Sequence, residues 1–252
     1  MINIVGAGPG ATDLITVRGL RLLQTADIII YAGSLVNPEL LQEAKDSCEI
    51  YNSAKMTLEE VIEVMKKGEA EGKMTVRLHT GDPSIYGAIR EQMDILKEEN
   101  IDYCVVPGVS SFCGAAAVVE KEYTLPNVSQ SVIITRMAGR TPVPDRESIR
   151  SFAEHQATMV IFLSTGLVAE VSKELIIGGY HKDTKAAIVY KATWPEEKIV
   201  YGTVGTLEEM ARKNNITKTA LILVGEFLGD NYDKSFLYDK NFTHEFRKGI
   251  EK

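Results

Sequence analysis

A glycine-rich segment near the start of the chain has the spacing of a phosphate-binding loop. Residues 6–11 (GAGPGA) follow a short apolar run and precede a helix-like stretch, which nearly satisfies the GxGxxG/A pattern of dinucleotide-binding enzymes. Pro9 argues against a pyrophosphate ligand, because it removes a backbone N–H from the loop that would hold the phosphates. The second apolar run ends at Tyr31-Ala32-Gly33, where a dinucleotide enzyme needs an acidic residue, and Asp27 stands at its beginning, the wrong end. A nicotinamide enzyme and a purely structural turn both stay open as alternatives.

Two more loops of small residues follow later strand-like runs. Thr80-Gly81-Asp82-Pro83 comes after the run 74–78, where a carboxylate is well placed for a ligand hydroxyl or a cation. The alternative is that Asp82 only caps a helix that begins with Pro83. Pro107–Ser111 follows the run 103–106, and Ser110 either caps the next helix or serves close backbone packing. Since open α/β sheets bind ligands at the carboxyl ends of their strands, we expect the three loops at one ligand-binding edge.

Short apolar runs alternate with amphipathic stretches through the first half of the chain. This alternation is typical of βαβ units and of a mainly parallel sheet. The pattern predicts strands at 2–5, 28–31, 74–78 and 103–106, and helices at 16–25, 57–71 and 84–99.

The segment 120–130, with Pro126 and Asn127 in it, breaks this alternation and predicts a linker. It separates an N-terminal α/β domain (1–119) from a C-terminal α/β domain (131–252), with the ligand expected between them. Strands in the second domain are predicted at 131–135, 158–162, 185–190, 198–203 and 221–224. The short connection Trp194–Glu197 predicts an antiparallel hairpin, so we expect a mixed sheet there.

The composition favours a globular protein that acts on a small molecule. A net charge of −7 argues against broad nucleic-acid binding, which relies on a positive field. The three cysteines lack CxxC spacing and the four histidines lack metal-ligand spacing, so no metal site is predicted. The first residues lack the pattern of a signal peptide, and the apolar runs are far shorter than the ~20 residues that span a bilayer. We therefore expect a cytoplasmic protein without a membrane segment.

Four motifs in this order resemble the tetrapyrrole (corrin/porphyrin) methylase family, and together they cover essentially the whole chain. They are GAGPG at 6–10, GDPSIYG at 81–87, PGVSS at 107–111 and TALILVG at 219–225. The segments 31–36 and 77–87 are most similar to the branch that methylates carbon 11 of precorrin-4. Uroporphyrinogen methylases of the family carry an acidic residue where this chain has Ala32, which favours a corrin substrate. Diphthine synthases share the cofactor motifs but lack the segment 32–36.

The resemblance implies two α/β domains, commonly in a homodimer, with S-adenosylmethionine bound in the cleft between the domains. Because S-adenosylmethionine has no phosphate, Pro9 is compatible with this cofactor. The residues that match the family's cofactor contacts are Pro9, Gly81, Asp82, Ile85, Ser110, Ser111, Leu163, Ala192, Thr219 and Ala220.

Methyl transfer from a sulfonium needs mainly a dry, oriented cleft, so no catalytic residue is assigned. An acidic protein that binds the carboxylates of a tetrapyrrole must cluster cations locally. The first candidates are Arg136, Arg140 and Arg146, unless their loop is only a solvated surface; Lys55 and Arg90 are secondary candidates. His79 is expected near the cleft. Methylation of another precorrin or of uroporphyrinogen, and a non-catalytic ligand-binding module, remain alternatives.

Overall fold

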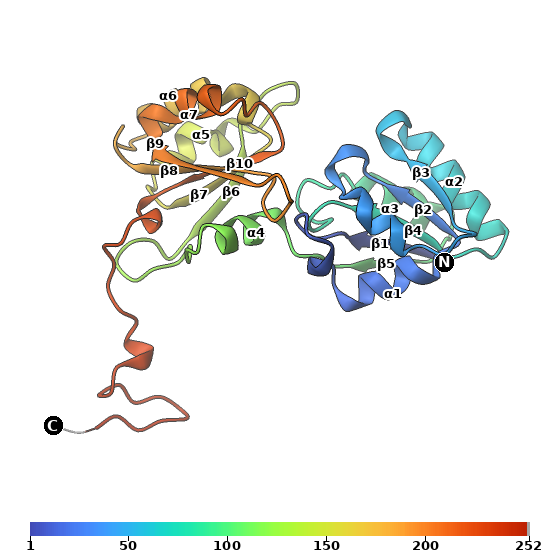
Figure 1. Ribbon diagram of the computed structural model, residues 1–252, viewed down its shortest axis with the longest axis horizontal. Helices are drawn as coiled ribbons and strands as arrows, with labels where there is room; N and C mark the ends of the chain where they lie inside the picture. Colours follow the sequence, from blue (N-terminus) through green and yellow to red (C-terminus); the bar gives the residue numbers. More distant parts are fainter. Residues whose placement is uncertain (251–252) are drawn as a thin grey trace. The chain divides into compact units, whose positions relative to one another are not determined.

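The computed structural model describes residues 1–250, which divide into two compact units (Figure 1). Unit 1 comprises Met1–Val118 together with Lys191–Glu197, and unit 2 comprises Val119–Tyr190 together with the chain from Lys198 onward. The linker predicted at 120–130 begins just after the chain first leaves unit 1. The return of residues 191–197 to unit 1 was not part of that prediction.

Unit 1 is built on a five-stranded sheet with the order β3-β2-β4-β1-β5, in which all neighbouring strands are parallel. Its strands are β1 (Ile2–Gly6), β2 (Ile28–Tyr31), β3 (Glu49–Asn52), β4 (Thr75–His79) and β5 (Tyr103–Val106). The residues of β1 and β4 are all buried, as expected for central strands of a parallel sheet that is covered on both faces. The edge strand β3 has no counterpart among the predicted strands.

Helices cover both faces of this sheet. They are α1 (Val17–Thr25), α2 (Leu58–Ala70) and α3 (Arg90–Glu98), while α4 (Ser111–Val118) follows the loop after β5 and lies against Pro9. Leu23 of α1 packs in the core on one face, and Met65 of α2 and Leu96 of α3 pack in the core on the other. The first two helices begin where their sequences favour it: Thr16 caps α1, and Thr57 and Glu60 form a capping box on α2.

The helix predicted at 84–99 is wrong at its start, because α3 begins only at Arg90. Tyr86 and Ala88 have φ angles of +56° and +49°, in the left-handed region that interrupts an α-helix. Residues 80–89 therefore form a loop, and Asp82 is not the N-cap of a helix.

Unit 2 contains a mixed sheet, as the sequence predicted, with the order β6-β7-β10-β8-β9. Its strands are β6 (Val132–Arg136), β7 (Thr158–Phe162), β8 (Lys185–Tyr190), β9 (Lys198–Thr203) and β10 (Ala220–Val224). β6 and β7 are parallel, whereas β10 is antiparallel to both β7 and β8, and β8 and β9 form the expected hairpin. Figure 1 shows α5 (Ile149–Ala153), α6 (Val168–Ile177) and α7 (Leu207–Lys213) on one face, where they enclose a single apolar core.

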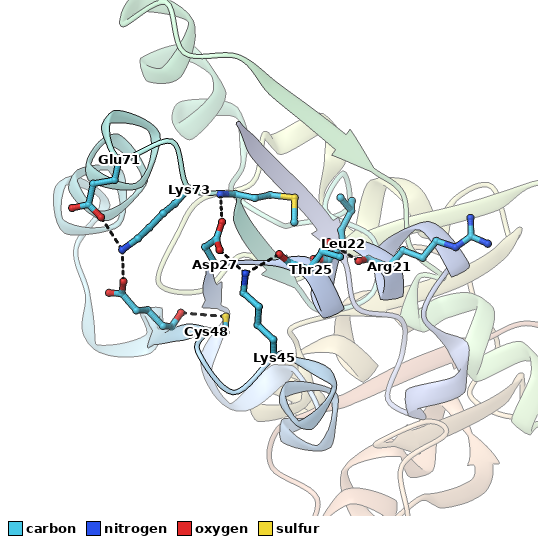
Figure 2. Close-up of polar contacts among 10 residues, drawn as sticks. Arg21, Leu22, Thr25, Asp27, Lys45, Cys48, Glu71 and Lys73 are labelled. Carbon is cyan, nitrogen blue, oxygen red and sulfur yellow. Dashed lines mark hydrogen bonds and ion pairs between the residues drawn. The ribbon is translucent and has the colours of Figure 1, made fainter.

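The amino ends of the unit 1 strands carry a network of charged side chains (Figure 2). The Asp27 carboxylate accepts hydrogen bonds from the Lys45 ammonium and from Met74 N–H, at 2.7 Å for the latter. Lys73 lies 2.6 Å from Glu49 and 2.7 Å from Glu71. The bond from Lys45, together with that from Met74 N–H, holds the pKa of Asp27 below its usual value. The Asp27 carboxylate thus links the residue before β2 to the residue before β4. This link lies at the amino ends of the strands, whereas the glycine-rich loops lie at their carboxyl ends.

The last described residues form an exposed segment. Phe236, Tyr238 and Phe246 have exposed fractions of 74%, 83% and 88%, and the segment is held by local bonds such as the one from Arg247 Nη2 to the Leu237 carbonyl oxygen, at 2.9 Å. Among residues 1–250, no helix is both long enough and apolar enough to cross a lipid bilayer.

Candidate functional site

The three glycine-rich loops meet at the carboxyl-end edge of the unit 1 sheet. Gly81 N–H donates to the Gly8 carbonyl oxygen at 2.8 Å, and Gly8 N–H donates to the Gly81 carbonyl oxygen at 3.3 Å. Ala7 N–H donates to the carbonyl oxygen of His79 at 2.7 Å. The loop after β1 is therefore paired, backbone to backbone, with the loop after β4.

The loop after β5 approaches the other two so closely that a side chain is excluded. A Cβ atom on Gly108 would lie 2.1 Å from the Gly81 carbonyl oxygen and 2.8 Å from Gly6 Cα. Both contacts are with backbone, which cannot swing aside as a flexible side chain can. Glycine at position 108 is thus required for the three loops to come together.

Asp82 ties the second loop to the third. Its Oδ1 accepts from Ser84 N–H at 2.8 Å and from the Ser84 hydroxyl, while its Oδ2 accepts from Gly108 N–H at 2.9 Å. Partial burial raises the pKa of Asp82, but the bonds from Ser84 and Gly108 outweigh it and leave the pKa below the usual value. The carboxylate is therefore charged at neutral pH. Its bonds connect the loop after β4 to the loop after β5 and do not cap a helix.

The other predicted cofactor residues of the first three motifs lie beside this pair. A Cβ atom on Gly81 would lie 3.3 Å from Ser111 N and 3.4 Å from Ser110 Cα, and Ser110 is itself buried. The Pro9 ring lies against the first turns of α4, since a Cβ on Gly114 would lie 2.7 Å from Pro9 Cβ. Ile85 follows in the turn closed by its N–H to the Asp82 carbonyl oxygen, at 3.2 Å.

The backbone of the first loop is occupied by bonds within the protein. Ala7 N–H and Gly8 N–H donate to the neighbouring loop as described, Ala11 N–H donates to Thr193 Oγ1 at 3.0 Å, and Pro9 has no N–H. The Pro9 carbonyl oxygen accepts from Trp194 Nε1 at 3.0 Å, and that of Gly10 accepts from Asn37 Nδ2 at 2.9 Å. Of the N–H groups at residues 7–11, only that of Gly10 makes no bond within the described residues, whereas dinucleotide enzymes hold a pyrophosphate with several such groups.

Ala192 reaches the same loop from the connection between β8 and β9. It is 6% exposed, and its carbonyl oxygen would lie 2.9 Å from a Cβ on Gly10. Seven of the ten predicted cofactor residues are thus gathered around the loops of unit 1, namely Pro9, Gly81, Asp82, Ile85, Ser110, Ser111 and Ala192.

The remaining predicted cofactor residues share one edge of the unit 2 sheet. β10 runs antiparallel to β7 with Ile222 opposite Ile161, which brings its first residue, Ala220, to the end of β7, where Leu163 follows. Leu163 is 66% exposed, and both Leu163 and Thr219 have left-handed φ angles, of +51° and +56°.

Arg136 belongs to the same edge of unit 2, because it is the last residue of β6 and pairs with Phe162. Its guanidinium closes the following loop: Nη1 donates to the Thr141 carbonyl oxygen at 3.2 Å and Nη2 to that of Pro142 at 2.7 Å. Arg140 and Arg146 are exposed on this loop, and Arg146 Nε lies 3.6 Å from Glu147. Arg136 shapes the loop, while the other two arginines present their charge to solvent.

The secondary cation candidates lie in unit 1. Lys55 is exposed and ends the short helix Ser53–Lys55 that follows β3, on the same edge as the glycine-rich loops. Arg90 begins α3, and its Nε lies 2.9 Å from Asp94 Oδ1. Arg90 is therefore already paired with a carboxylate on its own helix.

His79 lies at the end of β4 but is 4% exposed, and its Nε2 has no hydrogen-bond partner among the described residues. Burial, with a contribution from the nearby Arg77 charge, lowers the pKa of His79 to about 3. The ring is neutral at physiological pH, and it lies inside the unit rather than on the surface of the loops.

Comparison with known proteins identifies the family. The profile described as Tetrapyrrole (Corrin/Porphyrin) Methylases matches residues 1–208. A cobalt-precorrin-4 C(11)-methyltransferase from Methanocaldococcus jannaschii is 56% identical over 252 residues, which cover 100% of this chain and 97% of that protein. The chain belongs to the tetrapyrrole methylases. The resemblance noted in the sequence is thereby confirmed.

Solved structures agree with this assignment. This tetrapyrrole methylase matches the X-ray structure of a cobalt precorrin-4 methyltransferase of cobalamin biosynthesis with a TM-score of 0.89 and 50% identity, covering 91% of this chain and 96% of that one. It also matches a uroporphyrin-III C-methyltransferase from Thermus thermophilus complexed with S-adenosylhomocysteine. That match has a TM-score of 0.77 and 26% identity, and covers 90% of this chain and 98% of the other.

Three side chains of this methylase that contact the first loop were not predicted to do so: Asn37, Thr193 and Trp194. Each bonds to a backbone group distant in sequence, so no local pattern announces the contact. The one available signal is that the single tryptophan of the sequence stands beside a proline in the predicted hairpin connection.

Proposed function

We propose that this tetrapyrrole methylase transfers the methyl group of S-adenosylmethionine to carbon 11 of cobalt-precorrin-4, giving cobalt-precorrin-5. The observation that carries the proposal is the similarity, along the full chain, to a relative named for this reaction. Two features add support. Ala32 replaces the acidic residue expected of a uroporphyrinogen methylase, and the first loop is unsuited to a nucleotide pyrophosphate.

We infer that the loop edge of unit 1 holds the methyl donor through Pro9, Gly81, Asp82, Ile85, Ser110, Ser111 and Ala192. Leu163, Thr219 and Ala220 of unit 2 complete the proposed set. A loop with most of its N–H groups engaged suits a ligand without phosphates. The charged Asp82 is compatible with a ligand that carries hydroxyl groups and a cationic centre, since one lone-pair direction of Oδ2 is left beyond the bond from Gly108.

S-adenosylmethionine supplies an electrophilic methyl group on a sulfonium whose departure as a thioether needs no proton. The work of this chain is then to fix the donor and to exclude water, for which a rigid, hydrogen-bonded edge is suited. His79 offers no acid–base chemistry at neutral pH, because its ring is neutral and enclosed. No side chain is assigned as the base that removes a proton from the ring.

We propose that the loop 136–146 binds the acetate and propionate groups of the tetrapyrrole. Arg140 and Arg146 are exposed and able to make bidentate bonds with carboxylates, and Arg136 holds the loop that presents them. Lys55 is a further candidate at the loop edge of unit 1. Arg90 is a weaker one, because it would have to exchange its bond to Asp94 for one to substrate.

The test is transfer of label from methyl-labelled S-adenosylmethionine to cobalt-precorrin-4, with the ring position assigned by mass spectrometry and NMR. Metal-free precorrin-4 and uroporphyrinogen III serve as parallel substrates. Label at carbon 11, with the cobalt form preferred, supports the proposal. Label on uroporphyrinogen alone would overturn the substrate, and donor binding without transfer to any of the three would favour a non-catalytic binding module.

We also propose that the protein acts as a cytoplasmic homodimer that binds no nucleic acid. Its three cysteines are free, which suits a reducing compartment, and its net charge is −7. Light scattering coupled to size-exclusion chromatography measures the mass in solution, and a monomer across micromolar concentrations would contradict the dimer. Fractionation of the source cells tests the compartment.

A further inference from the structure

The connection between β8 and β9 holds the first glycine loop by two bonds. Trp194 Nε1 donates to the Pro9 carbonyl oxygen, and Thr193 Oγ1 accepts from Ala11 N–H, each at 3.0 Å. The two bonds lie on either side of Gly10, so the peptide groups that flank this residue are fixed by side chains from the other half of the sequence.

The Trp194 ring also packs closely against the Gly10 backbone. A Cβ atom there would lie 2.0 Å from Trp194 Cδ1 and 2.4 Å from Trp194 Nε1, so the indole rests directly on the Gly10 backbone. The buried Asn37 holds the Gly10 carbonyl oxygen from another direction. Residues 9–11 are therefore enclosed by side chains that leave the loop little freedom.

The connection itself keeps an unfavourable backbone. Lys191 and Thr193 have φ angles of +48° and +69°, and the left-handed region is costly for a β-branched residue such as threonine. Thr193 N–H donates to Glu197 Oε2 at 2.6 Å, and Lys191 Nζ lies 4.9 Å from the centroid of the Trp194 ring. A strained backbone of this kind persists only where the contacts around it fix its conformation. In this conformation the indole N–H and the threonine hydroxyl both face the first loop.

We propose that Thr193 and Trp194 are positioning residues for the methyl donor: they keep Pro9–Ala11 in the conformation that receives S-adenosylmethionine. This rests on the proposed function, in which Pro9 and Ala192 contact the donor. The polar atoms of both side chains are engaged by the loop, so they act through its backbone. Their loss raises the dissociation constant of the donor and leaves the rate at saturating donor nearly unchanged.

The experiment compares the purified full-length protein with Thr193→Val, Thr193→Ser, Trp194→Phe and Thr25→Val. Valine removes the acceptor of Ala11 N–H at nearly constant shape, serine restores it, and phenylalanine removes the indole N–H. Thr25→Val is the matched control, because the Thr25 hydroxyl donates to carbonyl oxygens of its own helix, near the amino ends of the unit 1 strands and opposite to the loops (Figure 2). Calorimetry with S-adenosylhomocysteine gives the dissociation constant, and initial rates with cobalt-precorrin-4 give KM for the donor and kcat.

We expect Thr193→Val and Trp194→Phe each to weaken S-adenosylhomocysteine binding by about three- to ten-fold, the range of one net hydrogen bond. KM for the donor rises in parallel, kcat stays within about twofold, Thr193→Ser recovers most of the affinity, and Thr25→Val binds as the wild type does. Wild-type affinity in both Thr193→Val and Trp194→Phe would overturn the proposal, and so would a fall in kcat without a change in affinity. Failure of the unmodified protein to bind S-adenosylhomocysteine at all would instead contradict the proposed function.

Fluorescence adds a readout that a purely structural role would not move. Trp194 is the single tryptophan of the sequence, so the tryptophan emission reports on this contact alone. Titration with S-adenosylhomocysteine should shift the emission and reduce its quenching by acrylamide, with the dissociation constant found by calorimetry. Calorimetric binding with an unchanged emission would show that the indole does not sense the loop.

Discussion

Replacing Asp82 with asparagine tests whether the tie between the second and third loops holds the donor site together. The carboxylate accepts from the Ser84 backbone and hydroxyl on one oxygen and from Gly108 N–H on the other. An amide has one oxygen and one NH₂ group. In either orientation of the substituted amide, the NH₂ therefore faces an N–H donor, and one of the two loop contacts is lost.

The size of the effect follows from that loss. A hydrogen bond to a charged group contributes about 1.5–3 kcal/mol, which corresponds to about a ten- to hundred-fold change in an equilibrium constant. The tie exists before any ligand binds, so part of the loss should appear in the free protein. A cost of this size lowers the thermal midpoint of a domain of 150–250 residues by about 3–12 °C.

The assay combines calorimetry with S-adenosylhomocysteine and thermal unfolding of the free protein, for the wild type, Asp82→Asn and Ser84→Ala. Ser84→Ala keeps the two backbone N–H bonds to Asp82 and removes only the bond from an exposed hydroxyl within the same loop, so its affinity should stay within about threefold of wild type. Weaker binding by Asp82→Asn at an unchanged thermal midpoint would mean that the carboxylate contacts the ligand without tying the loops. Wild-type values for both quantities would refute the reasoning altogether.

Three further outcomes are expected. Gly108→Ala places a methyl 2.1 Å from the Gly81 carbonyl oxygen, so S-adenosylhomocysteine binding by calorimetry should fall by at least about tenfold, and undiminished affinity would contradict the close approach. Arg140→Ala should raise KM for the tetrapyrrole by about tenfold without changing the donor dissociation constant. Arg150→Ala, which loses only its pair with Glu174, is the control and should change neither value. An unchanged KM in Arg140→Ala would show that this loop does not bind the substrate. The pKa of Asp27 is lowered, so its carboxylate stabilises the fold above the unfolded pKa, and that contribution is lost as the pH falls through the folded pKa. Asp27→Asn should accordingly be less stable than wild type in urea at pH 7, and the difference should shrink as the pH is lowered below about 4; a difference independent of pH would exclude the charge as its origin.

The sequence located the elements with continuous apolar runs and missed those without them. β7, β8 and β9 were predicted with the bounds that the structure has, because β7 and β8 are runs of mostly apolar residues and β9 contains the apolar run 199–201. β3 was missed because Glu49–Asn52 is short and alternates half-buried with exposed residues at the edge of the sheet. The start of α3 was misplaced because Pro83 is a favoured first helical residue, whereas the left-handed Tyr86 has no sequence signal of its own.

The site could be predicted as far as one edge of a sheet and no further. Three loops at the carboxyl ends of parallel strands must meet, and they do, so Pro9 and Gly81 lie together as the motifs implied. The bond from Gly108 N–H to Asp82 and that from Trp194 to Pro9 join distant parts of the sequence. Such contacts depend on the register of whole elements, which residue spacing does not encode.

The engaged backbone of the first loop bears on competition between adenine nucleotides in the cell. ATP carries the same adenosine as the proposed donor, and a loop with free N–H groups would gain binding energy from its phosphates. In this loop the N–H groups of Ala7, Gly8 and Ala11 donate to acceptors within the protein, and Pro9 has no N–H. A triphosphate at this loop would lose its water and gain at most the Gly10 N–H, so we expect the protein to bind ATP weakly without any group that repels it.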